Sequence, residues 1–477
     1  MSADATSNIE AGDKAGAGDK AGITIRYYTG VKASRVRAGV LTFAFLLAVI
    51  TYLDRVCISA AAPFITSDLH LTTLQMGKVF SAFALAYSLF EIPSGWLGDV
   101  SGPRRVLTRI VLWWSGFTML TGAALGFPSL VATRFLFGAG EAGAFPNMSR
   151  GLSRWFPLAE RGKANGVMFF GSRVGGMLSV PIVFVLIARW GWRASFVIVG
   201  SFGLVWAAAW HAWYRDRPAE HPSVSAGELA WIEQDRTDGQ DRREGRDGQK
   251  GRVRQDGQDG QDGRPDADQI ATPWRELARS RNLYAICAMY FTYGYGLYFY
   301  FTWLPTYLIQ VLGFSMLSGG LFAALPFLCA GIANLAGGWL TDVLARHRGL
   351  RAARCGLGFW AFLTGALLTF ASTLVPQSIA KAVLLALALG SVDLALGACW
   401  AVCLDIGRDH AGVVTGCMNT FSNLGGLLTP IVVAYAVERW QSWTFPFYVT
   451  AIVYATGAFI WLAIDPTQPI TAAQQQA

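Results

Sequence analysis

Residues 40–61 read VLTFAFLLAVITYLDRVCISAA, an apolar run of 22 residues whose only charged members are Asp54 and Arg55. A helix of about 20 apolar residues crosses the roughly 30 Å hydrocarbon core of a bilayer, so this stretch predicts a transmembrane helix. Counting this run, six such runs lie between residues 38 and 214 and six more between 283 and 464. None shows the ten-residue alternation of a membrane β-barrel. The sequence therefore predicts an all-α, polytopic membrane protein with twelve transmembrane helices.

The composition favours a membrane protein over every soluble class. Of the 477 residues, 53% are hydrophobic and 15% are charged, and more than half of the charges lie in residues 1–37 and 215–281. The rest of the chain is too poor in charge to form a water-soluble surface. A soluble enzyme, a disordered regulator and a secreted disulfide scaffold are excluded. The seven cysteines lie in or beside apolar runs without a Cys-x-x-Cys pair, so we interpret them as packing residues and predict no metal site.

An internal repeat divides the chain into two halves. Residues 95–99 (GWLGD) recur 243 positions later as GWLTD, and Gly166, Gly175 and Gly176 recur 250 positions later as glycines. We therefore predict two pseudo-symmetric six-helix bundles, an arrangement in which transporters bind substrate near the midplane between the halves. The predicted regions are a disordered tail (1–37), the first bundle (38–214), a linker (215–281) with a low-complexity segment (235–264), the second bundle (282–465) and a second tail (466–477).

The loop charges predict the orientation of the chain in the membrane. Basic residues such as Arg104 and Arg105 concentrate in the loops after the second, fourth, eighth and tenth runs. By the positive-inside rule, both termini and the linker face the cytoplasm. These residues do not form a patch with interleaved aromatics, so the net charge of +8 predicts no nucleic-acid partner. Residues 1–37 contain no removable signal peptide, and residues 223–234 are expected to form a short amphipathic helix on the membrane surface.

Seven ionisable side chains lie inside the apolar runs, where each costs roughly 2.5–3.5 kcal/mol on insertion scales. They are Asp54, Arg55, Glu91, Arg134, Glu141, Arg173 and Asp393. Adjacent helical residues point about 100° apart, so we expect Arg55 to face a central cavity and Asp54 to face a neighbouring helix such as the fourth run. Arg134 and Glu141 lie two turns apart on one helix face.

The three buried arginines outnumber Asp54 and Glu141, and an unpaired buried arginine predicts an anionic ligand such as a carboxylate. Asp54 or Glu141 could exchange protons as the cavity changes its exposure. The alternative is a static ion-pair network that pins the helices together. Glu91 is expected to bond across the adjacent loop, and the sequence leaves the role of Asp393 unassigned, although its depth is compatible with a second proton site.

Several motifs resemble those of a known family. Residues 95–105 resemble the signature loop of the major facilitator superfamily, and residues 134–141 resemble its fourth-helix motif. More narrowly, the chain is similar to the anion:cation symporter branch, which includes bacterial sugar-acid/proton symporters and the vesicular glutamate and sialic acid carriers. That similarity is carried by residues 52–55 (YLDR), 140–147 (GEAGAFPN), 155–161 (WFPLAER), 303–307 (WLPTY) and 418–426 (MNTFSNLGG).

The resemblance implies roles for individual residues. Asp54 and Glu141 would be the proton-linked carboxylates, with Arg134 beside them, and Arg55 would bind the substrate carboxylate. The remaining candidates for substrate contact are Arg173, Tyr52, Tyr87, Trp400, Asn419 and Asn423. The alternative to substrate contact is aromatic packing for Tyr87 and Trp400. For the two asparagines, the alternative is hydrogen bonding between helices. The candidates for a gate latch are Asp99, Arg104 and Arg105.

Arg173 departs from the sugar-acid members of the branch, which more often carry a neutral amide in this region. Its extra cation favours a dicarboxylate or an aromatic acid over a monocarboxylate sugar acid.

These features together predict proton-coupled symport of an organic anion by alternating access in the inner (plasma) membrane. The expected partners are a small carboxylate substrate, protons as the coupling ion and the lipid bilayer, with no other cofactor, and we expect a monomer. All five histidines lie in loops or at the ends of runs and no phosphate-binding loop occurs, so neither enzyme chemistry nor ATP hydrolysis is predicted. The alternatives are an anion exchanger, a proton-driven exporter and a non-transporting sensor of the same fold.

Overall fold

The computed structural model of the protein describes residues 35–232 and 274–470. This part of the chain is helical and contains no strand. The predicted tail 1–37, the low-complexity segment 235–264 and the tail 466–477 fall wholly or mostly outside the described residues.

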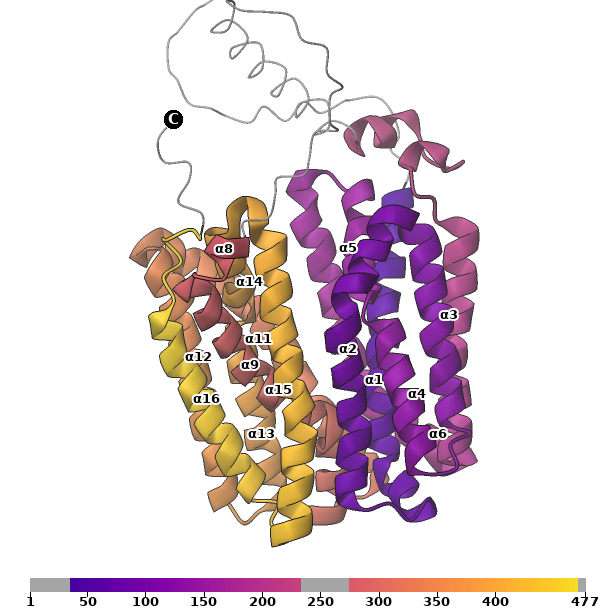
Figure 1. Cartoon of the computed structure of the whole chain (residues 1–477), viewed down its shortest axis with the longest axis vertical. Coiled ribbons are helices and arrows are strands. Elements are labelled where there is room, and N and C mark those ends of the chain that lie inside the picture. The colour runs from indigo at the N-terminus through magenta and orange to yellow at the C-terminus, as the bar shows by residue number, and fades with distance from the viewer. Residues whose placement is uncertain (1–34, 233–273, 471–477) are drawn as a thin grey trace, which may run out of the picture.

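The first half of the chain forms six helical elements, coloured indigo to magenta in Figure 1. They are α1 (Val36–Asp68), α2 (Thr73–Ser101), α3 (Pro103–Thr121), α4 (Phe127–Glu141), α5 (Ala144–Trp155) and α6 (Leu158–Trp213). Two turn residues, 142 and 143, separate α4 from α5, so these two helices form one interrupted crossing. The long α6 reverses direction at Gly191, whose φ of +76° lies in the left-handed region that glycine adopts without steric cost.

The second half is coloured from red through orange to yellow in Figure 1 and begins at the short helix α8 (Trp274–Leu277). Its main helices are α9 (Arg281–Thr302), α11 (Met316–Arg348), α12 (Leu357–Leu374), α13 (Ser378–Asp393), α14 (Leu396–Gly407), α15 (Ala411–Trp440) and α16 (Phe445–Ala463). Short turns of α10 (Leu304–Thr306) and η2 (Tyr307–Val311) extend α9, and η3 (Ala352–Gly356) leads into α12. Residues 394 and 395 interrupt the crossing formed by α13 and α14.

Seven stretches of helix in the described residues are each long and apolar enough to cross a membrane. One of them, Glu160–Trp213, folds back at Gly191 and supplies two crossings. The other four crossings are α2, α3, the pair α4 and α5, and α9. The prediction of an all-α fold with twelve transmembrane segments is therefore confirmed.

Glycines in the repeated motif let paired helices approach closely. A Cβ atom at Gly175 of α6 would lie 2.6 Å from the carbonyl oxygen of Val49 on α1. In the second half, a Cβ at Gly425 of α15 would collide with the carbonyl oxygen of Phe291 on α9. Each half thus uses a glycine to pack its fifth crossing against its first, which is the close approach that small residues allow between membrane helices.

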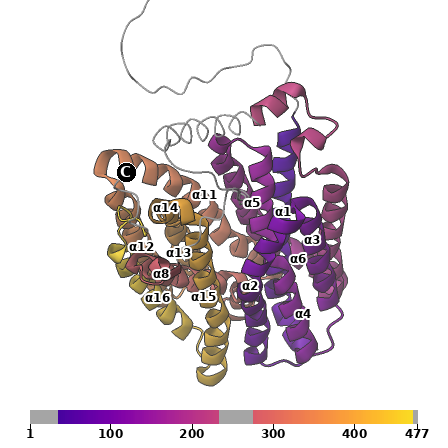
Figure 2. The same ribbon diagram turned by 45° about the horizontal axis from the view of Figure 1, so that its top comes forward.

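The two halves form bundles that stand side by side and diverge toward the side on which α6 ends and α8 begins, which we call the linker side (Figures 1 and 2). On the opposite side the bundles are in contact. A Cβ at Gly77 of α2 would lie 2.7 Å from the carbonyl oxygen of Pro430 on α15, and the backbone N–H of Leu74 donates to Glu438 over 2.7 Å. The two halves are therefore closed against each other on the side away from the linker.

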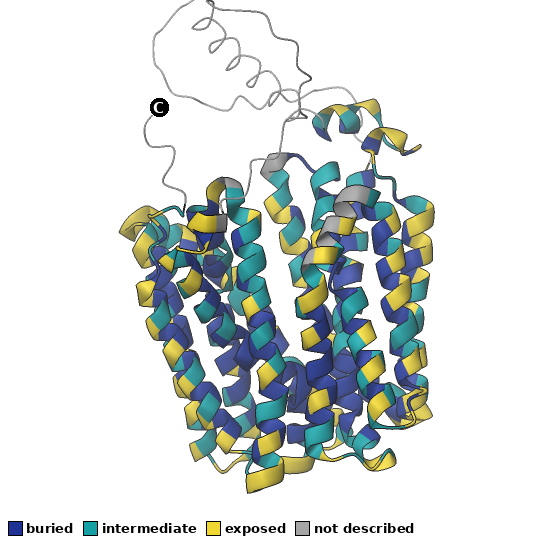
Figure 3. Cartoon of the chain, viewed as in Figure 1, coloured by how far each residue is buried: buried dark blue, intermediate teal, exposed yellow. Residues whose placement is uncertain are grey.

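Residues on the outer faces of the helices are mostly exposed or intermediate, whereas residues between the helices are mostly buried (Figure 3). Many of the exposed side chains are large and apolar, including Leu317, Val205 and Trp339 with exposures of 72%, 69% and 68%. An apolar surface of this kind suits contact with lipid.

The start of the linker is held against the first bundle. Residues 226–232 form a helix, and the Glu228 carboxylate accepts hydrogen bonds from the backbone N–H and the Nε of Arg37 at the start of α1 (3.0 and 3.3 Å). Trp231 Nε1 donates to Glu160 of α6 over 3.3 Å. The amphipathic helix expected at the membrane surface therefore docks on the linker-side ends of α1 and α6.

Candidate functional site

The middle of α1 directs two adjacent charges to two different helices. Trp114 Nε1 of α3 donates to Asp54 Oδ2 over 3.0 Å, whereas Arg55 Nε donates to Glu141 Oε1 over 3.0 Å at the end of α4. Asp54 and Glu141 are fully buried. The divergence of Asp54 and Arg55 matches the helical geometry, but Asp54 faces α3 and not the fourth crossing, and it is Arg55 that pairs with the fourth crossing.

Aromatic rings surround the Arg55 guanidinium. Its central carbon lies 5.1 Å from the ring centre of Tyr52 and 5.0 Å from those of Phe83 and Tyr87. Cation–π attraction stabilises the charge while leaving hydrogen-bonding positions for an anion. The Arg55 side chain is 10% exposed, against 0% for Glu141. Two predicted substrate contacts, Tyr52 and Tyr87, therefore lie beside the predicted anion-binding arginine.

Arg134 lies on α4 and is 1% exposed. Its guanidinium carbon lies 4.1 Å from the ring centre of Phe137 and 5.4 Å from that of Phe83. Its Nε and Nη1 are buried without a hydrogen-bond partner among the described residues. Arg134 thus brings a second positive charge to the neighbourhood of Glu141 and Asp54.

Arg173 of α6 reaches across to the second bundle. Its Nη2 lies 2.6 Å from Asp393 Oδ2 at the end of α13, and it donates to the Tyr293 hydroxyl of α9 over 3.0 Å. The same hydroxyl donates to Asp393 Oδ1 over 2.8 Å. The expectation that the buried arginines face only Asp54 and Glu141 is therefore wrong, because Asp393 from the other half compensates Arg173.

The remaining candidates for substrate contact lie near the boundary where α2 and α6 meet the second bundle. Asn419 Nδ2 of α15 donates to Glu91 Oε1 of α2, so Glu91 bonds across the interface and not across the adjacent loop as expected. Asn423 accepts from the Tyr298 hydroxyl over 2.9 Å, and the Trp400 ring lies 5.4 Å from that of Phe169 on α6. Helix-to-helix bonding and aromatic packing both occur here, at the boundary between the halves.

The gate candidates occupy the linker side of the first bundle. The side chain of Asp99 lies outside the described residues. The backbone N–H of Arg104 donates to Asp216 over 3.1 Å, and its Nε donates to the carbonyl oxygen of His211 over 3.0 Å, while Arg105 is exposed. These contacts join Arg104 to the end of α6 and to the first residues of the linker, and not to the second bundle.

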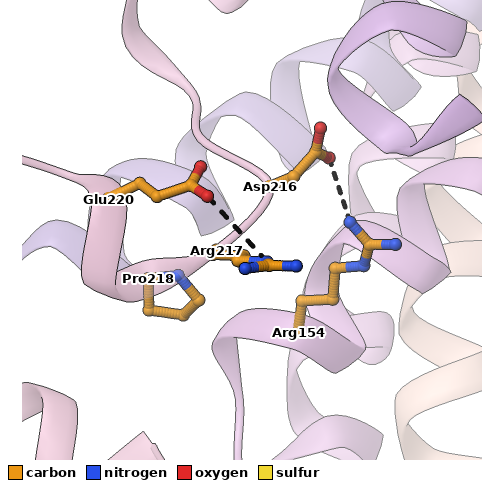
Figure 4. Close-up of a pocket in the computed structure, with 5 residues that line it drawn as sticks. All are labelled: Arg154, Asp216, Arg217, Pro218 and Glu220. Atoms are coloured by element: carbon orange, nitrogen blue, oxygen red, sulfur yellow. Dashed lines mark ion pairs between the residues drawn. The ribbon is translucent and has the colours of Figure 1, made fainter.

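A surface pocket lies next to these residues, and Figure 4 shows the side chains that line it: Arg154, Asp216, Arg217, Pro218 and Glu220. Asp216 pairs with Arg154 over 3.2 Å, and Glu220 pairs with Arg217 over 3.9 Å. The pocket is lined by residues of the linker side and by none of the buried charges of the membrane interior. We therefore place the candidate site at the buried arginines.

Two contact residues were not identified from the sequence, Trp114 and Tyr293. A tryptophan or tyrosine in an apolar run is indistinguishable from an ordinary packing residue until its partner is known. The repeat could have marked Asp393 as a second buried carboxylate of the kind found at Glu141. Glu141 and Asp393 lie 252 positions apart, close to the repeat offsets of 243 and 250, and each is the last residue before an interruption in its crossing.

Comparisons with known proteins agree with this geometry. The sequence model of the Major Facilitator Superfamily matches residues 44–428 and 320–477. The chain belongs to the major facilitator superfamily. This membership confirms the family resemblance. The protein is accordingly a membrane transporter and not an enzyme.

Relatives of this transporter carry names that refer to small organic anions. The probable sulfoacetate transporter SauU of Cupriavidus necator is 35% identical over 449 residues, which cover 94% of this chain and 97% of the relative. The probable galactarate/D-glucarate transporter GarP of Escherichia coli is 30% identical, covering 86% and 90%. The hexuronate transporter of Bacillus subtilis is 29% identical, covering 85% and 89%.

A solved structure shares the fold of the transporter. It is a bacterial homolog of the human lysosomal transporter Spinster in an inward-facing and unoccupied conformation, with a TM-score of 0.70. The match covers 90% of this chain and 97% of that one at 17% identity, so it supports the fold alone.

Proposed function

We propose that this transporter carries a small organic anion across the inner (plasma) membrane together with protons, by alternating access. The observation that carries the proposal is the Arg55–Glu141 pair: a partly accessible arginine, ringed by Tyr52 and Tyr87, whose counter-ion is a buried carboxylate. When Glu141 takes up a proton it becomes neutral, and Arg55 is then available to the carboxylate of a substrate. Anion binding at Arg55 and proton binding at Glu141 thereby favour each other.

The substrate class follows from the second arginine. Arg173 lies at the boundary of the two halves, and Tyr52, whose ring lies beside Arg55, packs against Gly175 two residues after Arg173 on α6. An acid with two anionic groups suits two such cations better than an acid with one. Sulfoacetate and D-glucarate each carry two anionic groups, and both appear in the names of relatives of this chain.

The loop charges also predict which side of the membrane the open ends of the bundles face. With the linker in the cytoplasm, the contacts on the opposite side close the protein toward the outside, so the structure corresponds to an inward-facing arrangement.

A dianion that enters with two protons moves no net charge, whereas a third proton adds one charge, worth about 2.3 kcal/mol per 100 mV. Arg104 would help to hold the linker side shut in the opposite state, together with Asp99 and Arg105.

Transport by the purified protein in proteoliposomes tests the proposal. An inward proton gradient should drive accumulation of labelled sulfoacetate or D-glucarate and make the external medium more alkaline. Arg55→Ala should abolish uptake, whereas Arg109→Gln, which removes an exposed arginine of α3, should preserve it. External acidification on adding substrate would indicate a proton-driven exporter instead, and uptake that requires anion inside but no proton gradient would indicate an exchanger.

A further inference from the structure

The Arg173–Asp393 pair joins two bodies that alternating access must move relative to each other. Arg173 lies on α6 of the first bundle and Asp393 on α13 of the second, with side-chain exposures of 8% and 0%. Tyr293 of the second bundle contacts both charges through its hydroxyl. A charged pair that is buried from water and bridged by a third group forms only when the helices that carry it lie in one particular arrangement. Any separation of α6 from α13 has to break it.

Asp393 occupies the position in the second half that Glu141 occupies in the first. Each is the last residue of its helix, before two turn residues. The packing at the two interruptions also repeats: a Cβ at Gly143 would lie 2.6 Å from the Cβ of Ser94 on α2, and a Cβ at Gly337 of α11 would collide with the carbonyl oxygen of Leu394. Ser94 and Gly337 lie 243 positions apart, the offset of the repeated GWLGD motif. The two carboxylates are thus repeat counterparts.

The two carboxylates nevertheless have different kinds of partner. Glu141 binds an arginine of its own bundle, whereas Asp393 binds an arginine of the opposite bundle. Arg173 also keeps a buried Nη1 that has no hydrogen-bond partner among the described residues. A guanidinium binds an acidic group through two parallel hydrogen bonds, so Arg173 retains capacity for a further anionic oxygen.

We propose that Asp393 is a resident counter-anion of Arg173, which the second acidic group of a dianionic substrate displaces. This inference rests on the proposed function, because it assigns Arg55 to one acidic group and Arg173 to the other. Displacement leaves Asp393 with the Tyr293 hydroxyl inside the second bundle and removes the ion pair between α6 and α13. A monoanion satisfies Arg55 alone and leaves the bundles tied. Asp393 therefore makes release of the bundles easier with a substrate that has two acidic ends than with a monoanion.

Matched acids test this assignment on the purified full-length protein. D-Glucarate and D-gluconate differ by one carboxylate in place of CH₂OH, and sulfoacetate and 2-hydroxyethanesulfonate differ in the same way. Calorimetry of the wild type should show preference for the dianion of each pair. Arg173→Gln should reduce that preference at least about tenfold with little change for the monoanions, because the second cation is gone. Asp393→Asn should tighten dianion binding about tenfold, because the competing carboxylate is gone.

Asp393→Asn leaves a charged arginine without its partner, so the variant is also measured by thermal shift. Its stabilisation by the dianions should exceed that of the wild type, whereas its response to the monoanions should not. The double variant Arg173→Gln/Asp393→Asn removes both charges, is expected to fold, and should bind both members of each pair alike.

A dianion preference that survives in Arg173→Gln or in the double variant would overturn the inference. Equal losses of binding affinity for dianions and monoanions in Asp393→Asn would also overturn it, because that result would show that Asp393 only stabilises the fold. Transport of monoanions by the wild type without a dianion preference would leave the proposed symport intact and reject only this inference. Absence of proton-driven uptake, with the dianion preference retained, would reject the proposed symport and leave the role of Asp393 in substrate selection intact.

Discussion

The two buried arginine–carboxylate pairs share their chemistry and differ in what they connect. Arg55 and Glu141 lie within the first bundle, so their pair can persist while the bundles move. Arg173 and Asp393 lie on opposite bundles, so movement of the bundles apart breaks their pair and the pair opposes that movement. A carboxylate that stays with its own rigid body is suited to carry a proton, whereas one that spans two bodies is suited to control their separation. We therefore propose that the same repeat position serves coupling in one half and conformational control in the other.

The largest expected effect separates coupling from binding in the first pair. Glu141→Gln should reduce proton-driven uptake to the level of protein-free vesicles, because the amide cannot bind and release the proton that couples uptake to the gradient. Counterflow of labelled substrate should continue, because that exchange needs no net proton movement and Arg55 stays in place. Both rates are measured in the same proteoliposomes. Loss of counterflow together with loss of binding would show that Glu141 shapes the anion site itself.

A stability comparison sharpens the difference between the pairs. Asp393→Asn should lower the free energy of unfolding by about 3–5 kcal/mol, because it leaves the buried Arg173 charged and unpaired. Glu141→Gln should cost only about 1–2 kcal/mol, because the Arg55 guanidinium still lies over three aromatic rings. Unfolding in mixed detergent micelles measures both.

The double variant Arg173→Gln/Asp393→Asn is the internal control for that comparison. It removes both charges and should recover most of the stability that Asp393→Asn loses. Equal losses for Glu141→Gln and Asp393→Asn would mean that the aromatic rings contribute nothing to holding Arg55.

Periodicity and repetition were sufficient to predict most of the fold. Apolar runs such as residues 40–61 predict crossings because the bilayer fixes the required length, and the GWLGD and glycine repeats predict the two halves. Within one helix, the 100° rotation per residue correctly separates Asp54 from Arg55. These predictions depend on segment length, helical periodicity and repetition, all of which are visible along the sequence.

The partners of the buried charges depend on how separate helices pack, which local periodicity does not encode. Trp114 and Tyr293 became polar contacts only because α3 and α9 present them to Asp54 and Asp393. The apparent excess of positive charge came from counting the first half alone, although Asp393 of the second half is the partner of Arg173. Extending the repeat from glycines to carboxylates would have paired Glu141 with Asp393 and exposed the error.

The smallest expected effect distinguishes two tyrosine hydroxyls on α9. Tyr293 bridges Arg173 and Asp393 between the bundles, whereas Tyr298 donates to Asn423 inside the second bundle. Removing either hydroxyl by substitution with Phe should cost about 1 kcal/mol of stability, the usual net contribution of one hydrogen bond. Only Tyr293→Phe should weaken D-glucarate relative to D-gluconate, by about fivefold, because a displaced Asp393 then lacks its remaining donor. An equal change of that ratio in Tyr298→Phe would show that any loosening of α9 alters selectivity, and the distinction between a pair within a bundle and a pair between bundles would then lose its functional meaning.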